Sequence, residues 1–244
     1  MTGHRSKNCL SSVDVAILAG GLGTRIRPVL GDIPKVLAPI NGATYLDHLL
    51  RHLYDNGARR VVMCLGHLAD KVTDHLACHC PPNGMTVDLV IEPTPLGTAG
   101  ALRLADQSFR TDPVMVMNGD TWIETDWCAF IAAHAESGAD TSILCVEVDD
   151  VSRYGQVQMN DGGRIEKFVE KSDCGTIAGT ISGGVYLFST SALRDLKSGD
   201  GPSLEVDFLQ KCAPGSLYGY VSNGGVFIDI GTPESLTTAD SLIN

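Results

Sequence analysis

The first loop of the chain combines glycine with cationic side chains in a pattern suited to binding a polyanion. The stretch AILAGGLGTRIRPVLGDIPKVLAPI, residues 16–40, begins with an apolar run and then breaks into glycines. The glycines are Gly20, Gly21 and Gly23, and the cations are Arg25, Arg27 and Lys35. Glycine lets backbone N–H groups approach phosphate oxygens without a Cβ in the way. Cationic side chains beside such a loop can neutralise β- and γ-phosphates and stabilise departing pyrophosphate.

This loop differs from the common phosphate-binding motifs. It matches neither the P-loop GxxxxGK[ST] nor a GxGxxG that runs directly into a helix. The glycines alone could form a purely structural turn. Arg25 and Lys35 beyond them favour an anion-binding loop.

The elements that would position this loop alternate between strands and helices. Residues 13–19 are continuously apolar, as expected of a strand buried on both faces. Leucines at helical spacing predict a helix over residues 44–56. Further strands are expected at 60–65, 86–91 and 113–117, and further helices at 68–78 and 98–108. This alternation implies a parallel sheet covered on both faces, with the loop after the first strand at its ligand-binding edge.

After about residue 140 shorter strands replace this alternation. The NDGG sequence at 160–163 predicts a hairpin turn, with further strands at 141–148, 181–188 and 225–230 and short helices at 203–211 and 233–243. No linker or repeat marks a domain break. We therefore expect a disordered leader over residues 1–12 and a single domain over residues 13–244.

Composition and charge exclude several classes of protein. The chain has 244 residues, of which 43% are hydrophobic, enough for one sizeable core. Its net charge of −11 argues against a nucleic acid or an anionic membrane as partner. No apolar run approaches a membrane span, and the first residues lack the apolar core of a secretory signal. We expect a cytoplasmic protein.

The eight cysteines are scattered along the chain, and several lie in apolar runs. This distribution favours reduced, mostly buried thiols over a disulfide framework. The group formed by His75, Cys78, His79 and Cys80 lacks a second pair at zinc-site spacing. A helix end with incidental cysteines is therefore favoured over a structural zinc site.

Several further motifs stand in the order and at the spacing of one enzyme family. LAGGLGTRIRP is followed by PK and AP, and then by EPTPLGTAGAL, NGDT, YGQV, FVEK, GGVYLF and FIDIGTPE. Over residues 15–239 the chain resembles the sugar-1-phosphate nucleotidylyltransferases. Within that family, DIPKVLAPINGATYLDHLL and SLEVDFL are most similar to the D-glycero-D-manno-heptose 1-phosphate guanylyltransferase group. The resemblance implies a three-layer αβα Rossmann-like nucleotidyltransferase fold with a mixed, mostly parallel central sheet.

The implied reaction converts a nucleoside triphosphate and a sugar 1-phosphate to an NDP-sugar and pyrophosphate, a step of nucleotide-sugar and polysaccharide biosynthesis. The sugar phosphate oxygen is already ionised, so its attack on the α-phosphorus needs alignment and charge neutralisation rather than a general base. Mg²⁺ held by carboxylates would neutralise part of the negative charge of the phosphates. The resemblance implies Asp120 in NGDT and Asp229 in FIDIGTP as its ligands, although either alone could be a capping or turn residue.

The resemblance also assigns the remaining site residues. Its implied catalytic residues are Arg25, Lys35, Asp120 and Lys171. Its implied nucleotide-binding residues are Leu18, Ala19, Gly20, Gly21, Gly23, Thr24, Arg25, Lys35, Glu92, Gly97, Thr98 and Asp120. Its implied sugar-phosphate-binding residues are Asn118, Gly155, Glu170, Lys171, Gly183 and Gly184. Residues 13–140 would accordingly form a nucleotide-binding half and residues 141–244 a sugar-phosphate-binding half.

Glu92 occupies the position where members of this family read the base. Its carboxylate could accept both the N1–H and the N2–H₂ of guanine, which makes GTP the preferred nucleotide, although a single bond could serve another base. Arg27 ranks below Arg25 because it can pair with Asp32 or Glu234. His67 is expected to be structural or incidental.

The residues Ser203, Glu205 and Asp207 are typical of the start of a helix, where acidic side chains complement the dipole. Three functions stay open at this point. The first is transfer to a manno-heptose 1-phosphate; the second is the same chemistry on mannose 1-phosphate or with UTP or CTP. The third is a non-catalytic regulatory relative that binds nucleotide sugars. The implied phosphate and metal ligands are all present, which favours catalysis, and a homodimer is left open.

Overall fold

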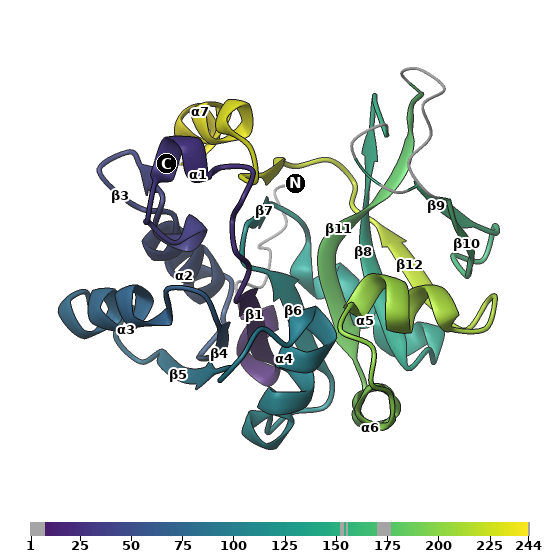
Figure 1. Cartoon of the computed structure of the whole chain (residues 1–244). Helices are drawn as coiled ribbons and strands as arrows, with labels where there is room; N and C mark the ends of the chain where they lie inside the picture. Colours follow the sequence, from purple (N-terminus) through teal and green to yellow (C-terminus); the bar gives the residue numbers. More distant parts are fainter. Residues whose placement is uncertain (1–7, 152–153, 155, 170–176, 244) are drawn as a thin grey trace.

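The first half of the chain alternates strands and helices, as its pattern predicts (Figure 1). The computed structural model describes residues 8–151, 154, 156–169 and 177–243. The strands of this half are β1 (Asp14–Ala19), β2 (Pro39–Ile40), β3 (Ala43–Thr44), β4 (Arg60–Leu65), β5 (Thr86–Ile91), β6 (Val114–Asn118) and β7 (Thr121–Ile123). The helices are α1 (Arg27–Leu30), α2 (Tyr45–Asp55), α3 (Ala69–Cys78), α4 (Gly97–Ala105) and α5 (Trp127–Ser137).

The second half is richer in antiparallel strands. Its strands are β8 (Thr141–Val148), β9 (Gln156–Met159), β10 (Ile165–Val169), β11 (Gly179–Phe188), β12 (Tyr218–Val221) and β13 (Phe227–Asp229). Its helices are α6 (Thr190–Ser198) and α7 (Pro233–Leu242). Where one short helix is expected over 203–211, the chain forms a π-helical turn at Leu204–Phe208 and then a 3₁₀ turn at Leu209–Lys211.

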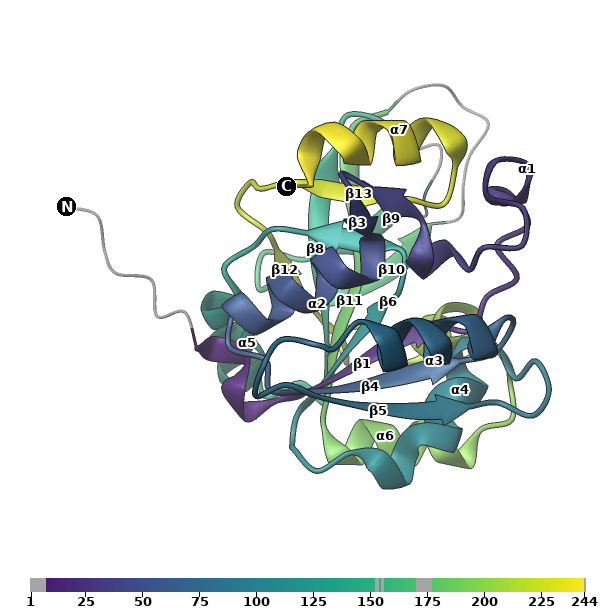
Figure 2. The ribbon, with the colours of Figure 1, turned by 90° about the vertical axis from the view of Figure 1, so that its left-hand side faces the viewer.

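The central sheet joins the two halves. Its strands follow the order β10-β9-β11-β6-β1-β4-β5, and β8 pairs with both β11 and β12. Neighbours among β6, β1, β4 and β5 are parallel, whereas β11 runs antiparallel to β6, β8 and β9. Helices α2 and α3 cover one face of the β1–β4–β5 region, and α4 and α6 cover the other (Figure 2). The expected fold class, a three-layer α/β fold around a mixed, mostly parallel central sheet, is confirmed.

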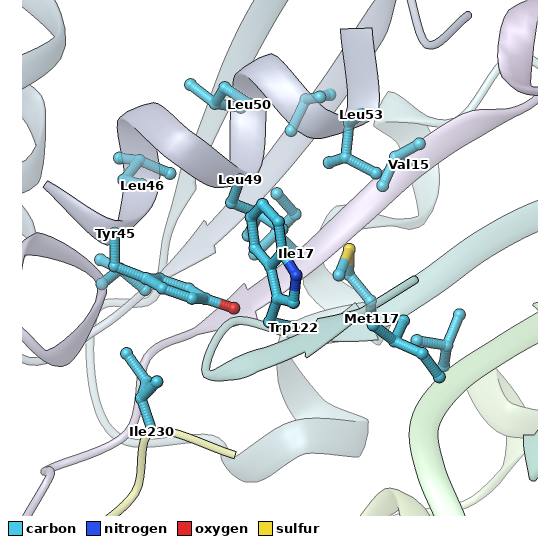
Figure 3. Close-up of a cluster of buried hydrophobic side chains, with 14 of the residues drawn as sticks. Val15, Ile17, Tyr45, Leu46, Leu49, Leu50, Leu53, Met117, Trp122 and Ile230 are labelled. Atoms are coloured by element: carbon cyan, nitrogen blue, oxygen red, sulfur yellow. The ribbon is translucent and has the colours of Figure 1, made fainter. Parts of the chain in front are cut away.

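Helix α2 shows how the sequence produces this packing. Its buried leucines are Leu46, Leu49, Leu50 and Leu53, spaced so that they share one face of the helix. That face packs over β1 and Trp122 in the principal core (Figure 3). The helix begins at a capping box, in which the side chains of Thr44 and Asp47 each accept a hydrogen bond from the other residue's backbone N–H.

Two expectations about the first residues are wrong. Cys9–Ser12 form a 3₁₀ turn, and Leu10 is fully buried with its N–H donating to the carbonyl oxygen of Asn56 over 3.2 Å. The predicted disordered leader therefore does not include these residues, because Leu10 contributes to the core. Cys9 also forms a disulfide with Cys128 of α5, so these two cysteines are not the reduced thiols that their scatter suggested.

The other described cysteines are free. Cys64 and Cys145 are buried, as expected, and burial raises the pKa of each thiol to about 12. Cys78 and Cys80 are exposed at the end of α3. In the part of the chain that the structure describes, no helix is long and apolar enough to cross a membrane.

Candidate active site

The loops that follow β1, β4 and β6 meet at one edge of the central sheet. Leu18 pairs with Cys64 of β4 and with Asn118 of β6, so these parallel strands end at about the same level. The N–H of Gly119 donates to the carbonyl oxygen of Leu18 over 2.8 Å. A Cβ at Gly119 would lie 2.7 Å from that oxygen, so only glycine fits, and Asp120 follows directly beside the opening loop.

A cavity of about 580 Å³ opens at this edge, and we call it the larger cavity. The predicted nucleotide-binding residues that line it are Leu18, Ala19, Gly20, Gly21, Gly23, Lys35, Glu92, Gly97, Thr98 and Asp120. Thr24 and Arg25 are predicted for the same group, but neither is part of this lining, and both are exposed.

Two residues that ranked low in the sequence also line the larger cavity. Arg27 forms the expected exposed ion pair with Asp32, at 3.3 Å, and lines the cavity as well. His67, expected to be structural or incidental, follows β4 and is exposed at the wall of the cavity. The signal that could have found His67 is its position directly after a parallel strand, at the edge where ligands bind.

Glu92 is held tightly at the wall of the larger cavity. Its Oε2 accepts the backbone N–H of Leu96 over 2.8 Å, which fixes the turn into α4. Its Oε1 packs against the backbone of Gly20 and Gly66, where a Cβ on either glycine would collide with it. The carboxylate therefore has a defined orientation, and the adjacent glycines provide the space for it.

The start of α4 connects the larger cavity to the segment around residue 202. Gly97 has φ +74°, and a Cβ there would collide with the carbonyl oxygen of Pro202. The N–H of Ala99 donates to that same oxygen over 2.9 Å. The Oγ1 of Thr98 accepts the N–H of Leu204 over 2.8 Å. The requirement for glycine at position 97 thus comes from close backbone packing, in addition to any room it leaves for a ligand.

A second cavity of about 270 Å³, which we call the smaller cavity, lies beside the first. The predicted site residues that line it are Arg25, Asn118, Asp120, Gly183, Gly184 and Asp229. Asn118 and Asp120 line both cavities. The arrangement therefore offers two compartments that meet at the end of β6.

Lys35 and Asp120 form an ion pair at this junction. The Nζ of Lys35 lies 2.6 Å from Oδ2 of Asp120, and both side chains are mostly buried. Asp229 is brought to the same place because β13 pairs with β7, with Asp229 opposite Thr121. The N–H of Ile230 donates to the carbonyl oxygen of Asp120 over 2.9 Å, which holds the two acidic segments together.

The two carboxylates influence one another. Burial, and next the negative charge of Asp120, raises the pKa of the Asp229 carboxyl group. The N–H of Gly231, which donates to Asp229 Oδ1 over 2.7 Å, and the charges of Lys35 and Arg25 oppose that rise. Two carboxylates therefore lie in one partly buried place, and Lys35 and Arg25 offset only part of the effect that burial and Asp120 have on Asp229.

The paired glycines of β11 form a bulge in the wall of the smaller cavity. The register of β11 against β8 shifts between Ser182 and Val185. Gly184 has φ +69°, and a Cβ there would lie 2.8 Å from Nδ2 of Asn118. The two glycines thus form a β-bulge, which brings backbone to the cavity surface.

Three predicted residues, Gly155, Glu170 and Lys171, lie outside the described residues, and their roles stay predictions. Sequence reasoning missed Tyr186 and Glu205, which also line the smaller cavity. The phenol of Tyr186 donates to Oε1 of Glu205 over 2.9 Å. Glu205 resembles a helix-start residue in the sequence, and only its tertiary partner identifies it as part of the cavity.

The metal-like cluster of the sequence does not assemble into a site. His75 pairs with Asp47, its Nε2 lying 2.9 Å from Oδ1, and its ring stacks on that of His79. Among the described residues, no group of three or more histidine, cysteine, aspartate or glutamate side chains is arranged to hold a metal ion. Any metal at Asp120 and Asp229 would therefore take its other ligands from substrate or water.

The chain is similar to known nucleotidyl transferases over most of its length. Residues 15–244 match the family described as nucleotidyl transferase. The chain is 31% identical, over 232 residues, to D-glycero-alpha-D-manno-heptose 1-phosphate guanylyltransferase of Aneurinibacillus thermoaerophilus, covering 93% of this chain and 96% of that protein. It is 30% identical to mannose-1-phosphate guanylyltransferase of Mycobacterium tuberculosis, covering 91% of this chain but 62% of that protein.

A solved structure agrees with these relatives. The chain is similar to HddC from Yersinia pseudotuberculosis complexed with GMP-PN, with a TM-score of 0.83 and 38% identity. The match covers 94% of this chain and 98% of HddC. The similarity therefore extends over almost the whole of both chains.

Proposed function

The chain belongs to the nucleotidyl transferase family and is a sugar-1-phosphate nucleotidylyltransferase, and from this premise we propose that it transfers a guanylyl group from GTP to D-glycero-D-manno-heptose 1-phosphate. The products would be the GDP-sugar and pyrophosphate. Mannose 1-phosphate is the second candidate acceptor, because relatives named for that sugar are also about 30% identical.

The observation that carries the proposal is the junction of two cavities at Asn118 and Asp120. The larger cavity has the volume and the glycine-rich lining for a nucleoside triphosphate, and the smaller one suits a sugar 1-phosphate. With both substrates bound, the α-phosphate and the sugar phosphate would meet at the junction. Holding the reacting groups together in this way can supply a large part of the catalysis.

The chemistry asked of the protein is alignment and charge neutralisation. We assign Lys35 and Arg25 to the phosphates, since Lys35 lies at the junction and Arg25 lines the smaller cavity with Asp229. Lys171 is proposed to bridge the sugar phosphate and the α-phosphate. Because the attacking phosphate oxygen is ionised at neutral pH, no side chain is assigned as a general base.

We also propose Mg²⁺ as the cofactor, held by Asp120 and Asp229. Their carboxylate oxygens, whose negative charge Lys35 and Arg25 offset only in part at Asp229, fit this ion, which is commonly bound by one or two carboxylates together with phosphates and water. When bound, Mg²⁺ would neutralise charge on the phosphates of the transition state. Gly231 and Ile230 would keep both aspartates in position through the backbone hydrogen bonds described above.

The assignment of guanine rests on Glu92. Glu92 lines the larger cavity, and although its Oε2 already accepts the N–H of Leu96, a carboxylate has further lone pairs with which to accept hydrogen bonds from N1–H and N2–H₂ of the base. Support comes from the relatives named as guanylyltransferases and from the complex of HddC with GMP-PN.

The test is a matrix of GTP, ITP, UTP and CTP against the 1-phosphates of D-glycero-D-manno-heptose, mannose and glucose, with pyrophosphate release as the readout. We expect the highest kcat/KM for GTP with the manno-heptose substrate. A preference for mannose 1-phosphate would select the second candidate. A preference for a pyrimidine nucleotide would contradict the assignment of guanine while leaving the reaction class intact.

A further inference from the structure

Glu205 occupies an unusual position for an acidic side chain at a helix start. It lines the smaller cavity, and its Oε1 accepts the phenol O–H of Tyr186 over 2.9 Å. Tyr186 is itself fully buried in β11 and lines the same cavity. Glu205 is exposed at the mouth of this cavity, and the hydrogen bond from Tyr186 anchors its carboxylate on the cavity wall.

A chain of hydrogen bonds determines the orientation of this anchor. The N–H of Gly184 donates to Oγ of Ser182 over 3.2 Å, and that hydroxyl donates to the Tyr186 oxygen over 3.4 Å. The hydroxyl group of Tyr186 accepts this hydrogen bond and in turn donates its own hydrogen bond to Glu205. Burial, and next the negative charge of Glu205, raises the pKa of the Tyr186 phenol, which keeps it protonated as a donor.

The turn that carries Glu205 is fixed at its base. Leu204 is buried, and its N–H donates to Oγ1 of Thr98. The Oγ of Ser203 accepts the N–H of Val206 over 3.1 Å. Glu205 and Val206 are both exposed, but only Glu205 lines the smaller cavity, so Val206 is a neighbour in the same turn that does not face it.

The second carboxylate oxygen of Glu205 is available for a ligand. Among the residues that the structure describes, Oε2 makes no hydrogen bond, and Glu205 forms no ion pair. An ionised carboxylate accepts hydrogen bonds only, and the hydroxyl groups of a sugar are donors of matching kind. Bonds to a charged acceptor are also stronger than bonds between neutral groups.

We propose that Glu205 binds a hydroxyl group of the sugar 1-phosphate and thereby helps to determine which sugar the enzyme accepts, with Tyr186 as the residue that positions it. This inference rests on the proposed function, in which the smaller cavity holds the sugar 1-phosphate. The sequence placed sugar binding on other residues of this cavity, so Glu205 would be an added contact from the π-helical turn.

The test compares Glu205→Ala with the parent enzyme on a set of altered sugars. The substrate is α-D-mannose 1-phosphate or the corresponding manno-heptose 1-phosphate, whichever the parent uses better, together with its 2-, 3- and 4-deoxy analogues. We expect the substitution to lower kcat/KM for the parent sugar about ten- to a hundredfold. With the parent enzyme, one deoxy analogue should show a kcat/KM lowered by a similar factor relative to the complete sugar. With Glu205→Ala, the same analogue and the complete sugar should have nearly equal kcat/KM, as a double-mutant cycle requires for a direct contact.

Three controls separate sugar binding from a structural effect. The Kd for GTP should change less than about twofold in Glu205→Ala, because the larger cavity is untouched. Val206→Thr, in the same turn but with an exposed side chain, should behave as the parent. Tyr186→Phe should lower kcat/KM less than Glu205→Ala and should weaken the discrimination against the same deoxy analogue.

The outcomes are distinguishable. Glu205 does not contact the sugar if removal of each hydroxyl group lowers kcat/KM by the same factor in the variant as in the parent enzyme. The same conclusion follows if the affinity for GTP falls together with the affinity for the sugar. If the parent enzyme transfers to neither sugar, the proposed function fails, and this inference fails with it. If the parent enzyme is active but Glu205→Ala loses no discrimination against any deoxy analogue, the role of Glu205 is contradicted while the proposed function stands.

Discussion

The ammonium group of Lys35 lies 2.6 Å from Oδ2 of Asp120, although 85 residues separate them in the chain. Lys35 comes from the segment after the glycine-rich loop, and Asp120 follows β6. Their ion pair joins the two loops at the place where the larger and smaller cavities meet. Because both side chains are mostly buried, the pair helps to shape the site before any substrate binds.

The first prediction concerns the metal ligands. Asp120→Asn should lower kcat by at least about a hundredfold, because an uncharged amide is a poor Mg²⁺ ligand. Removal of Mg²⁺ with EDTA should abolish the activity of the parent enzyme, and added Mg²⁺ should restore it. The control is Asp106→Asn, which removes an ion pair of the same 2.6 Å length, to Lys197, away from both cavities. Near-normal turnover of the Asp120 variant, or full activity in excess chelator, would contradict the metal assignment.

The second prediction separates the roles of Arg25 in binding and in chemistry. Arg25→Ala should lower kcat at least about tenfold, because Arg25 lines the smaller cavity with Asp120 and Asp229, where its charge is needed most as negative charge builds up on the reacting phosphates in the transition state. The affinity for the GDP-sugar product, in which that charge has not built up, should fall much less. Steady-state kinetics and product titration measure the two effects. Equal losses of rate and of product affinity would make Arg25 a general binding residue.

The third prediction concerns the base. GTP should be preferred over ITP about ten- to a hundredfold in kcat/KM, since ITP lacks the 2-amino group and one bond to the charged Glu92. Glu92→Gln should reduce this preference, because the amide offers one acceptor and places an NH₂ donor opposite a donor. The same comparison with UTP and CTP shows whether the variant has lost selectivity or only activity. An unchanged ratio of GTP to ITP in the variant would remove Glu92 from base recognition.

The fourth prediction follows from the contact between Gly66 and Glu92. Gly66→Ala should collide with Oε1 of Glu92 and destabilise the protein by about 1–3 kcal/mol, as overpacking usually does. In a Glu92→Ala background the same change should cost clearly less, because the closest colliding atom is gone and only the carbonyl oxygen of Gly20, 2.9 Å from the added Cβ, remains in the way. Gly199→Ala is the matched control, since a Cβ there would have only an ordinary contact with Leu196. Urea unfolding of the four variants measures the coupling, and simple additivity would contradict it.

The fifth prediction concerns stability and pH. Burial lowers the pKa of His134, whose Nδ1 lies 2.7 Å from Oγ of Ser142, and it lowers that of His52 as well. Below about pH 6.5 the unfolded chain therefore binds protons that the folded protein does not, and the free energy of unfolding falls as pH falls. The slope should be at most about 1.4 kcal/mol per pH unit for each histidine.

His134→Gln should reduce that slope between pH 6.5 and 5, as measured by urea unfolding at a series of pH values. The matched change His79→Gln, at the exposed end of α3, should leave the slope as it is. A slope that His134→Gln does not alter would show that another group is responsible.

Sequence reasoning predicted the elements whose signals are local. β1 was evident from its apolar run, and α2 was evident from its leucine spacing. It missed α5, whose sequence WCAFIAAHAES has no clear contrast between an apolar and a polar face. It also missed the disulfide between Cys9 and Cys128, which are 119 residues apart, because pairing depends on the spatial separation of the two residues.

The sequence by itself determined the reaction class, because its motifs resemble those of one enzyme family in order and spacing, and the comparisons confirm that class. Only the tertiary structure decided that Arg25 lines the smaller cavity, that Asn118 and Asp120 lie where the two cavities meet, and that Glu205 is anchored on Tyr186. These relationships depend on strand order and on the close packing of segments far apart in the chain. Residue type and spacing along the chain do not encode them directly, because they arise only when the sheet brings the ends of its strands together.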